Sequence, residues 1–319
     1  MGSVSNLSFD DQISLLKSRG ITFEEQKHNK DVHSLQVIGY YKLKEFAEVF
    51  ARGQNEHGDT LYREIEFSEV IKRYYQDKNL RVRIFHAIES IEVALNTSIS
   101  YQLGTNYGAF GYLSFRDWTD HSISGFDLEK KQYDFKKYLL SSLKRNSSLD
   151  LKNPINRNSD GFPTVWLMTD LLMFGESVAL FKLMSRNNQI AVATSLGCTA
   201  KELISWLPML NLVRNICSHN SDLLDIRLVT VPYIPRDYME CLYKNSNRYT
   251  NRIAIIIYII KSLMKVINPT YQFHDIWASL TNVVGGDDRL AMELGFTNAD
   301  IIEKISPKPA NRRGQNKHK

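Results

Sequence analysis

Residues 81–100, RVRIFHAIESIEVALNTSIS, decide the fold class because they follow a strongly helical pattern. Isoleucine or leucine recurs every three or four positions, at 84, 88, 91, 95 and 99, which places these side chains on one face of an α-helix. The pattern extends from Ser68 to Leu103 without proline or glycine. We therefore expect a long helix, with a bend near residues 77–79 and a stop at Gly104.

Helical patterns also dominate on both sides of this segment. Downstream, Thr199 is a candidate N-cap for a helix that reaches Trp206, and Pro208 fits the first turn of a further helix. Strand signals are scarce, the best being RLVTVPY at residues 227–233. The sequence therefore predicts an all-α helical bundle.

Three parts are expected along the chain. The polar stretch RGQNEHGD at residues 52–59 ends an N-terminal helical appendage that covers residues 1–60. The main helical domain then covers residues 61–303. The remaining residues, 304–319, are rich in Pro, Asn and Lys, and we expect them to form a disordered basic tail.

Composition excludes several classes of protein. The apolar content of 43% is enough to bury a sizeable core, and the first residues show no secretory signal. The most apolar stretch, residues 253–260, is far shorter than the roughly 20 residues that span a bilayer, so we expect a buried core helix and no membrane anchor. Three scattered cysteines without a CxxC pair indicate neither a zinc site nor a disulfide framework, which fits a reducing cytoplasm. No metal and no cofactor is expected.

The positive charge is concentrated in the tail. Of the 40 Lys and Arg residues, six lie in residues 304–319, and the rest of the chain holds 34 against 35 acidic residues. The tail could be a solubilising extension or a non-specific arm that contacts RNA phosphates through Arg312 and Arg313. Residues 127–157 also carry eight basic against four acidic side chains, which could form an RNA-tracking surface or a solvated helix face. The candidate RNA contacts there are Lys144, Arg145, Lys152 and Arg157.

The sharpest local feature is RNICSH, residues 214–219, near the end of an apolar helix. RNA cleavage without metal needs a group that moves a proton on or off the 2′-hydroxyl or the leaving oxygen, and a histidine suits this task. It also needs a fixed cation for the charge that builds on the phosphate, which a guanidinium can supply. His219 and Arg214 are therefore the candidate catalytic residues.

Helix geometry separates these two side chains. Five residues along a regular helix amount to about 140° of rotation and roughly 7.5 Å of rise, so Arg214 and His219 cannot meet one phosphate. Either the helix ends before His219, or a second protomer completes the site. In the alternative interpretation, which spacing alone favours, His219 caps a helix C-terminus and Arg214 forms a salt bridge.

Glu92 lies about 50° from the centre of the apolar stripe of its own helix. A carboxylate in that position is costly unless it is paired, and Arg214 and Arg81 are the two candidate partners. Glu92 could therefore orient a catalytic Arg214 or simply satisfy a buried arginine.

With these segments in view, the chain resembles the Abi-like (AbiD/AbiF) abortive-infection proteins of the HEPN superfamily, from about residue 9 to residue 225. Residues 214–219 match the R-x(4–6)-H motif of that superfamily, with the usual polar residue after the arginine. The chain differs from the common pattern at Asp170, Asn220 and Asp225. Three further segments carry the resemblance in the same order: LQVIGYYKLK at 35–44, the IEVAL helix at 88–97, and Pro163, Trp166, Phe174 and Gly175.

The resemblance implies an α-helical HEPN bundle, usually dimeric, whose active members are metal-independent RNases of phage defence that leave 2′,3′-cyclic phosphate ends. Arg214 would then stabilise the phosphate, His219 would move the proton, Asn215 would position substrate or His219, and Glu92 would orient Arg214. The partners expected are RNA and a second copy of the chain. The alternative function is a non-catalytic RNA-binding protein, bound to a regulatory small non-coding RNA like those encoded beside some relatives.

Overall fold

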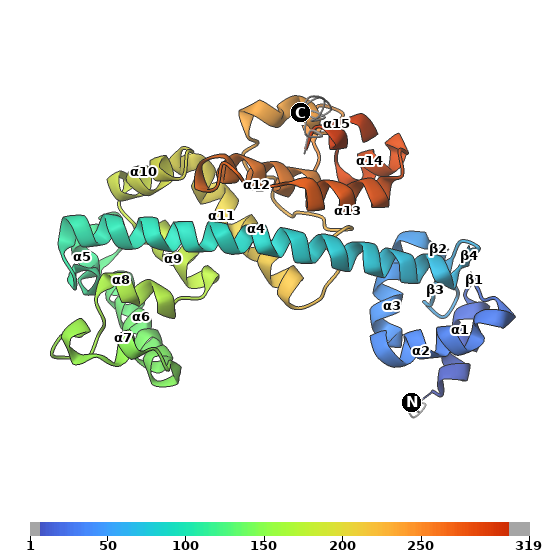
Figure 1. The fold of residues 1–319 in the computed structure, drawn as a ribbon, viewed down its shortest axis with the longest axis horizontal. Helices are drawn as coiled ribbons and strands as arrows, with labels where there is room; N and C mark the ends of the chain where they lie inside the picture. The colour runs from blue at the N-terminus through green and yellow to red at the C-terminus, as the bar shows by residue number, and fades with distance from the viewer. Residues whose placement is uncertain (1–6, 306–319) are drawn as a thin grey trace, which may run out of the picture.

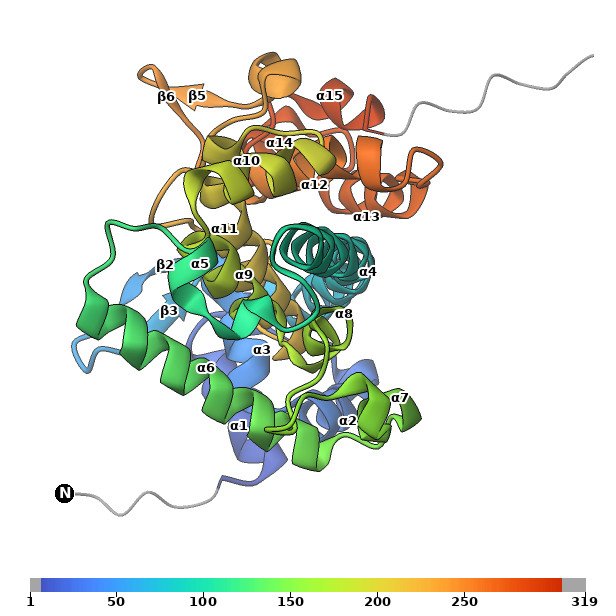
Figure 2. The ribbon, with the colours of Figure 1, turned by 90° about the vertical axis from the view of Figure 1, so that its left-hand side faces the viewer.

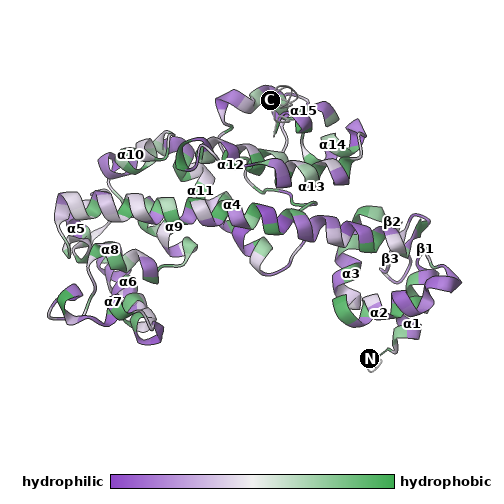
Figure 3. Ribbon diagram, viewed as in Figure 1, coloured by the Kyte–Doolittle hydropathy of each residue, from purple (hydrophilic) through white to green (hydrophobic). Residues whose placement is uncertain are grey.

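A computed structural model describes residues 7–305 of the chain, and its longest element is the helix α4, Phe67–Tyr107. The α4 helix has 41 residues and forms the axis on which most other elements pack (Figure 1). The described part of the chain is mostly helical with a few two- to four-residue strands, so the predicted all-α class is confirmed. Figure 3 shows hydrophobic and hydrophilic residues alternating along α4, as expected for a helix with a buried and an exposed stripe.

The expected bend and stop in α4 were both wrong. The helix runs without interruption through residues 77–79, where the buried Asp77 carboxylate is satisfied by Arg81 one turn later and by two backbone N–H groups of another segment. Gly104 lies inside the helix because the indole of Trp166 packs against it, and a Cβ there would lie 3.0 Å from the indole nitrogen. The helix ends instead at Gly108, whose φ of 76° is readily adopted only by glycine.

The N-terminal part packs at one end of α4 and has its own hydrophobic core (Figure 1). That core includes Leu35, Phe46 and Tyr62, and it continues into Phe67 and Val70 of the first turn of α4. The segment expected as a loop, residues 52–59, contains the turn of a short hairpin. The elements here are α1 (Phe9–Ser18), β1 (Ile21–Thr22), α2 (His28–Ile38), α3 (Tyr40–Ala47), β2 (Ala51–Gln54), β3 (Thr60–Tyr62) and β4 (Ile65–Glu66).

A second group of helices packs around the other end of α4. Figure 2, which looks along α4, shows α6 lying across this end of the molecule and α10 on the side of the C-terminal helices. Tyr112, Phe115 and Trp118 are fully buried here. The helices of the group are α5 (Phe115–Trp118), α6 (Gly125–Arg145), α7 (Leu149–Lys152), α8 (Val165–Met168), α9 (Phe174–Leu183) and α10 (Arg186–Ser195).

The helix α11, Ala200–Ser218, crosses α4 and carries the RNICSH segment at its C-terminal end. Thr199 caps it as predicted, in a capping box with Glu202. The expected new helix at Pro208 was wrong, because α11 continues through this proline. Three fully buried side chains on the continuing face, Leu207, Leu210 and Val213, each contribute about 1.5–3 kcal/mol, which offsets the roughly 3 kcal/mol cost of an interior proline.

The C-terminal elements cover the side of α4 opposite to α8 (Figures 1 and 2). Residues 253–260 are buried as predicted, inside α12. No strand forms at residues 227–233, where the chain is irregular. No helix within residues 7–305 is long and apolar enough to cross a membrane. The elements are η6 (Arg236–Cys241), β5 (Lys244–Asn245), β6 (Arg248–Tyr249), α12 (Ile253–Ile267), α13 (His274–Val284), α14 (Asp288–Leu294) and α15 (Ala299–Glu303).

The predicted tail, residues 304–319, begins on the folded body. Ile305 is buried, and the Lys261 ammonium donates hydrogen bonds to the carbonyl oxygens of Lys304 and Ile305, at 3.0 and 2.6 Å. Residues 306–319, which include Arg312 and Arg313, lie outside the described part of the structure. The tail therefore stays a prediction from sequence.

Candidate functional site

The end of α11 keeps helical geometry through the RNICSH segment. Although the helix ends at Ser218, the backbone N–H of His219 still donates to the carbonyl of Asn215, at 2.9 Å. Asn220 then adopts a left-handed conformation with φ of 57°, and the N–H of Ser221 closes the helix on the carbonyl of Ile216. Because the register is maintained, the helix end does not turn the imidazole towards Arg214.

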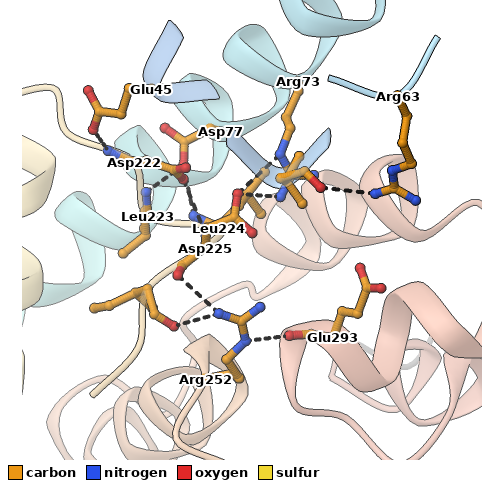
Figure 4. A network of polar contacts seen from close by, with 12 residues as sticks. Glu45, Arg63, Arg73, Asp77, Asp222, Leu223, Leu224, Asp225, Arg252 and Glu293 are labelled. Atoms are coloured by element: carbon orange, nitrogen blue, oxygen red, sulfur yellow. Dashed lines mark hydrogen bonds and ion pairs between the residues drawn. The ribbon is translucent and has the colours of Figure 1, made fainter. Parts of the chain in front are cut away.

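A buried ion pair fixes this helix end from α4. The Arg81 guanidinium donates to the Asp77 carboxylate through Nε and to the Asn220 side-chain oxygen through Nη1, at 3.1 Å. Asp77 also accepts the backbone N–H groups of Leu223 and Leu224, at 2.8 and 3.0 Å (Figure 4). Asn suits position 220 because it tolerates left-handed backbone and carries a side-chain acceptor. The position of His219 is therefore set by contacts on both sides of it.

The same network joins the N-terminal part to the end of α11 (Figure 4). A carboxylate oxygen of Glu45 in α3 accepts the backbone N–H of Asp222 at 2.9 Å, and Arg73 of α4 forms an ion pair with Asp225 at 2.6 Å. Burial, followed by the charges of Asp225 and Asp77, raises the pKa of the Asp222 carboxyl from 3.8 to about 8. The carboxyl groups of Asp77, Asp222 and Asp225 therefore lie close together just after the RNICSH segment.

This pKa makes folding stability sensitive to pH. An acid with a higher pKa in the folded chain holds a proton that unfolding releases, so raising the pH from about 4 to about 8 lowers stability. We expect the melting temperature of the wild type to fall between pH 6 and 9, and the fall to be smaller in Asp222→Asn. Thermal unfolding followed by circular dichroism measures both, with the exposed Asp134→Asn of α6 as control. Parallel falls in all three proteins would contradict the assignment.

Arg214 lies on the other edge of α11, in a pocket of about 540 Å³ between α11, α4 and the segment after α8. Its guanidinium carbon is 5.9 Å from the centre of the Phe85 ring, and its buried Nε has no hydrogen-bond partner in the described part of the chain. Within residues 7–305 no carboxylate forms an ion pair with it. The salt bridge of the alternative interpretation is therefore not formed in the described structure.

Glu92 lines the same pocket as Arg214. Burial raises the pKa of the Glu92 carboxyl, and the charge of Arg214 partly offsets that rise. Arg81, the other candidate partner, is engaged with Asp77. Of the two partners that the sequence left open for Glu92, the structure thus places Arg214 beside it.

Other polar groups of the pocket were not predicted as site residues. The side-chain oxygen of Asn96 is buried and has no hydrogen-bond partner among residues 7–305, and burial raises the pKa of the Asp170 carboxyl. Trp166, which is 53% exposed, forms part of the rim. Asn96 lies one helical turn after Glu92, and this spacing is the sequence signal that could have identified it as a site residue. Asp170 and Trp166 come from a distant segment. The pocket combines a half-buried cation, carboxyl groups and aromatic rings.

Asn215 and His219 lie outside this pocket, on the exposed face of α11. His219 is the C-cap residue of α11, as the alternative interpretation expected, and within residues 7–305 its imidazole makes no hydrogen bond and no ion pair. Leu212, 41% exposed, shares this face by the 100° helical rotation. One protomer therefore brings Arg214 and Glu92 together but not Arg214 and His219.

The predicted basic surface lies at the far end of α6. Lys144 and Arg145 are exposed in its last turn, and Lys152 is exposed at the end of α7. Arg157 is half-buried, and its Nε donates to the carbonyl of Leu151 at 2.6 Å, so part of its guanidinium has a structural role. Among the described residues no group of three or more His, Cys, Asp or Glu side chains is placed to hold a metal ion.

Comparison with known proteins gives one match. A protein-family model described as "Abi-like protein" matches residues 33–225, which is more than half of the chain. The matched segment runs from α2 to the loop after α11 and so contains α4, the Arg214 pocket and His219. No curated protein and no solved structure shows a significant match to the chain.

Proposed function

The chain belongs to the Abi-like protein family, and on this premise we propose that it is a metal-independent HEPN-type endoribonuclease of abortive-infection defence against phage. The substrate is RNA. In the proposed reaction the 2′-oxygen of one nucleotide attacks the neighbouring phosphorus, and the bond from phosphorus to the 5′-oxygen breaks. The products are a 2′,3′-cyclic phosphate and a 5′-hydroxyl, and one proton moves from the attacking to the leaving oxygen.

The observation that carries this proposal is the free imidazole of His219 at a rigidly held helix end. An exposed imidazole that makes no hydrogen bond or ion pair within residues 7–305 has both nitrogens available for proton transfer. Its backbone is fixed by Asn215 before it and by the Arg81–Asn220 contact after it. Such a fixed, accessible proton carrier is what a general acid or base needs.

Arg214 provides the cation of the proposed site. Its Nε lacks a hydrogen-bond partner among the described residues, and the pocket around it leaves room for a phosphate oxygen to accept from the guanidinium. Glu92 beside it is the positioning residue, and Asn215 is placed one helical turn before His219 to orient substrate or imidazole. Because Arg214 and His219 lie on different faces of α11, we propose that a homodimer combines them.

The second candidate is a non-catalytic protein that binds a small non-coding RNA. The separation of Arg214 from His219 within one protomer favours it, since a monomer of this structure has no complete site. The basic residues Lys144, Arg145 and Lys152 would then contact phosphates without any cleavage.

Cleavage in the presence of EDTA distinguishes the metal-independent ribonuclease from the non-catalytic RNA-binding protein. Purified protein incubated with end-labelled RNA and excess EDTA is expected to give fragments that end in 2′,3′-cyclic phosphate, identified by their resistance to a phosphatase until mild acid opens the ring. RNA that is bound but stays intact, with or without added divalent cations, would favour the binding protein.

The basic tail is expected to strengthen RNA binding without selecting the cleavage site. Removal of residues 306–319 eliminates five basic side chains and leaves the buried Ile305 in place. For each phosphate that the tail neutralises, its removal should reduce the slope of log affinity against log salt concentration by about 0.7, the value for single strands. Anisotropy titrations at several salt concentrations measure this slope, and a full-length control with the five residues changed to Gln should behave like the deletion. An unchanged slope would assign the tail to solubility.

A further inference from the structure

A second cavity, of about 790 Å³, lies on the C-terminal half of the body and away from the Arg214 pocket. It is bounded by the hairpin β5–β6, the segment that leads into α12 and the end of α14. It lies outside residues 33–225, which the family model matches. Its charged and aromatic side chains are Arg227, Tyr243, Arg248, Tyr249, Arg252 and Glu293.

The cavity is strongly basic. Arg252 is fixed by the carbonyl oxygens of Glu293 and Asp225, at 2.7 and 3.0 Å (Figure 4). Arg227 and Arg248 are exposed and form no ion pair within the described part of the chain. Burial lowers the pKa of the Arg252 guanidinium and the charge of Arg227 lowers it further, which the charges of Asp225 and Glu293 offset only in part, so the two cations repel each other. An anion between them would remove that repulsion.

The aromatic lining restricts what the anion can be. Tyr243 and Tyr249 are half-buried in the cavity wall, and the Lys244 ammonium lies 4.3 Å from the centre of the Tyr249 ring. Tyrosine faces next to guanidinium groups are the surface on which unpaired bases stack while their phosphates are neutralised. An acidic peptide would use the arginines but would have no base to place against the rings.

We propose that this cavity binds a short single-stranded segment of RNA, with phosphate between Arg227, Arg248 and Arg252 and a base against Tyr249. The proposal rests on the proposed function only in taking RNA as the ligand. Arg227 follows His219 by eight residues, so their Cα atoms are at most about 29 Å apart. One RNA strand can therefore reach both the cavity and His219 of the same protomer.

The test measures binding of a fluorescent 12-nucleotide single strand by anisotropy, with all proteins carrying His219→Ala so that the RNA stays intact. Arg227→Ala with Arg248→Ala is expected to weaken binding roughly tenfold at low salt and to reduce the salt slope by about 0.7 for each phosphate that the two arginines neutralise. The matched control is Arg236→Ala with Arg289→Ala, two exposed arginines outside the cavity. Arg252 is left unchanged because it holds three backbone carbonyls.

The Tyr249→Leu variant tests whether a base stacks against the Tyr249 ring. It is expected to weaken binding about tenfold for the normal strand and to leave an abasic strand of the same length unaffected. Equal binding by the cavity variant and its control, or displacement of the RNA by poly-glutamate alone, overturns the proposal. If the wild type never cleaves RNA but the cavity variant still binds more weakly than its control, the cavity stands and the proposed function fails. If the wild type cleaves RNA but both double variants bind it equally well, the proposed function stands and RNA binding by the cavity is excluded.

Discussion

The His219→Ala protein is expected to lose RNA cleavage by a factor of about 10²–10⁴ while melting at the wild-type temperature. The loss follows from removal of the proposed proton carrier. The unchanged stability follows from the structure, because the imidazole is exposed and makes no hydrogen bond within residues 7–305. The contacts that hold the helix end belong to the backbone and to Asn220, and alanine preserves both.

Two controls make this result specific. His121→Ala removes another exposed histidine, outside the Arg–His motif, and should leave cleavage unchanged. Asn215→Ala lies on the same exposed face as His219 and should reduce cleavage less, since it does not itself carry the proton. Initial rates on one labelled RNA, together with melting curves, give both readouts. If His219→Ala lowered the melting temperature in proportion to the activity, its role would be structural.

Much of the fold could be predicted because the helical spacing of apolar residues is visible within short stretches of the sequence. The stripe from Ile84 to Ile99 is fully buried, and the capping box at Thr199 starts α11 where the sequence indicates. The errors occurred where tertiary packing outweighed a local stop signal. Pro208 and Gly104 both favour helix ends, yet buried leucines on one side and the Trp166 indole on the other keep each residue inside a helix.

The candidate site was predictable only in part. Helical arithmetic correctly separated Arg214 from His219 and put Glu92 at the edge of its stripe, because each of these relations lies within a single helix. The contacts that hold the end of α11 could not be predicted, since the Asp77 carboxylate accepts the backbone N–H of Leu223 from 146 positions away in the sequence. The same holds for the aromatic rim, because Trp166 reaches the Arg214 pocket through the fold and not through sequence spacing.

A mixed dimer of Arg214→Ala and His219→Ala protomers is expected to recover about half of the wild-type activity per dimer, although each variant is inactive alone. The reason is the placement of the two side chains on different faces of α11, one in the Glu92 pocket and the other in solvent. If each site takes Arg214 from one protomer and His219 from the other, the mixed dimer keeps one complete site. Two affinity tags used in sequence isolate that dimer, and single-turnover cleavage measures its activity.

The reverse combination distinguishes a shared site from two independent ones. A wild-type protomer paired with one that carries both Arg214→Ala and His219→Ala leaves each shared site without either its cation or its proton carrier. Removal of either group costs on the order of 10²-fold in rate, so this dimer should be nearly inactive. Independent protomers would instead leave about half of the activity here and none in the complementing pair, since each site would then depend on one chain. The complementing dimer is therefore the active one if the site is shared, and the dimer with one wild-type protomer is the active one if the protomers are independent. A fully active monomer in a sedimentation experiment would exclude the shared site without either mixed dimer.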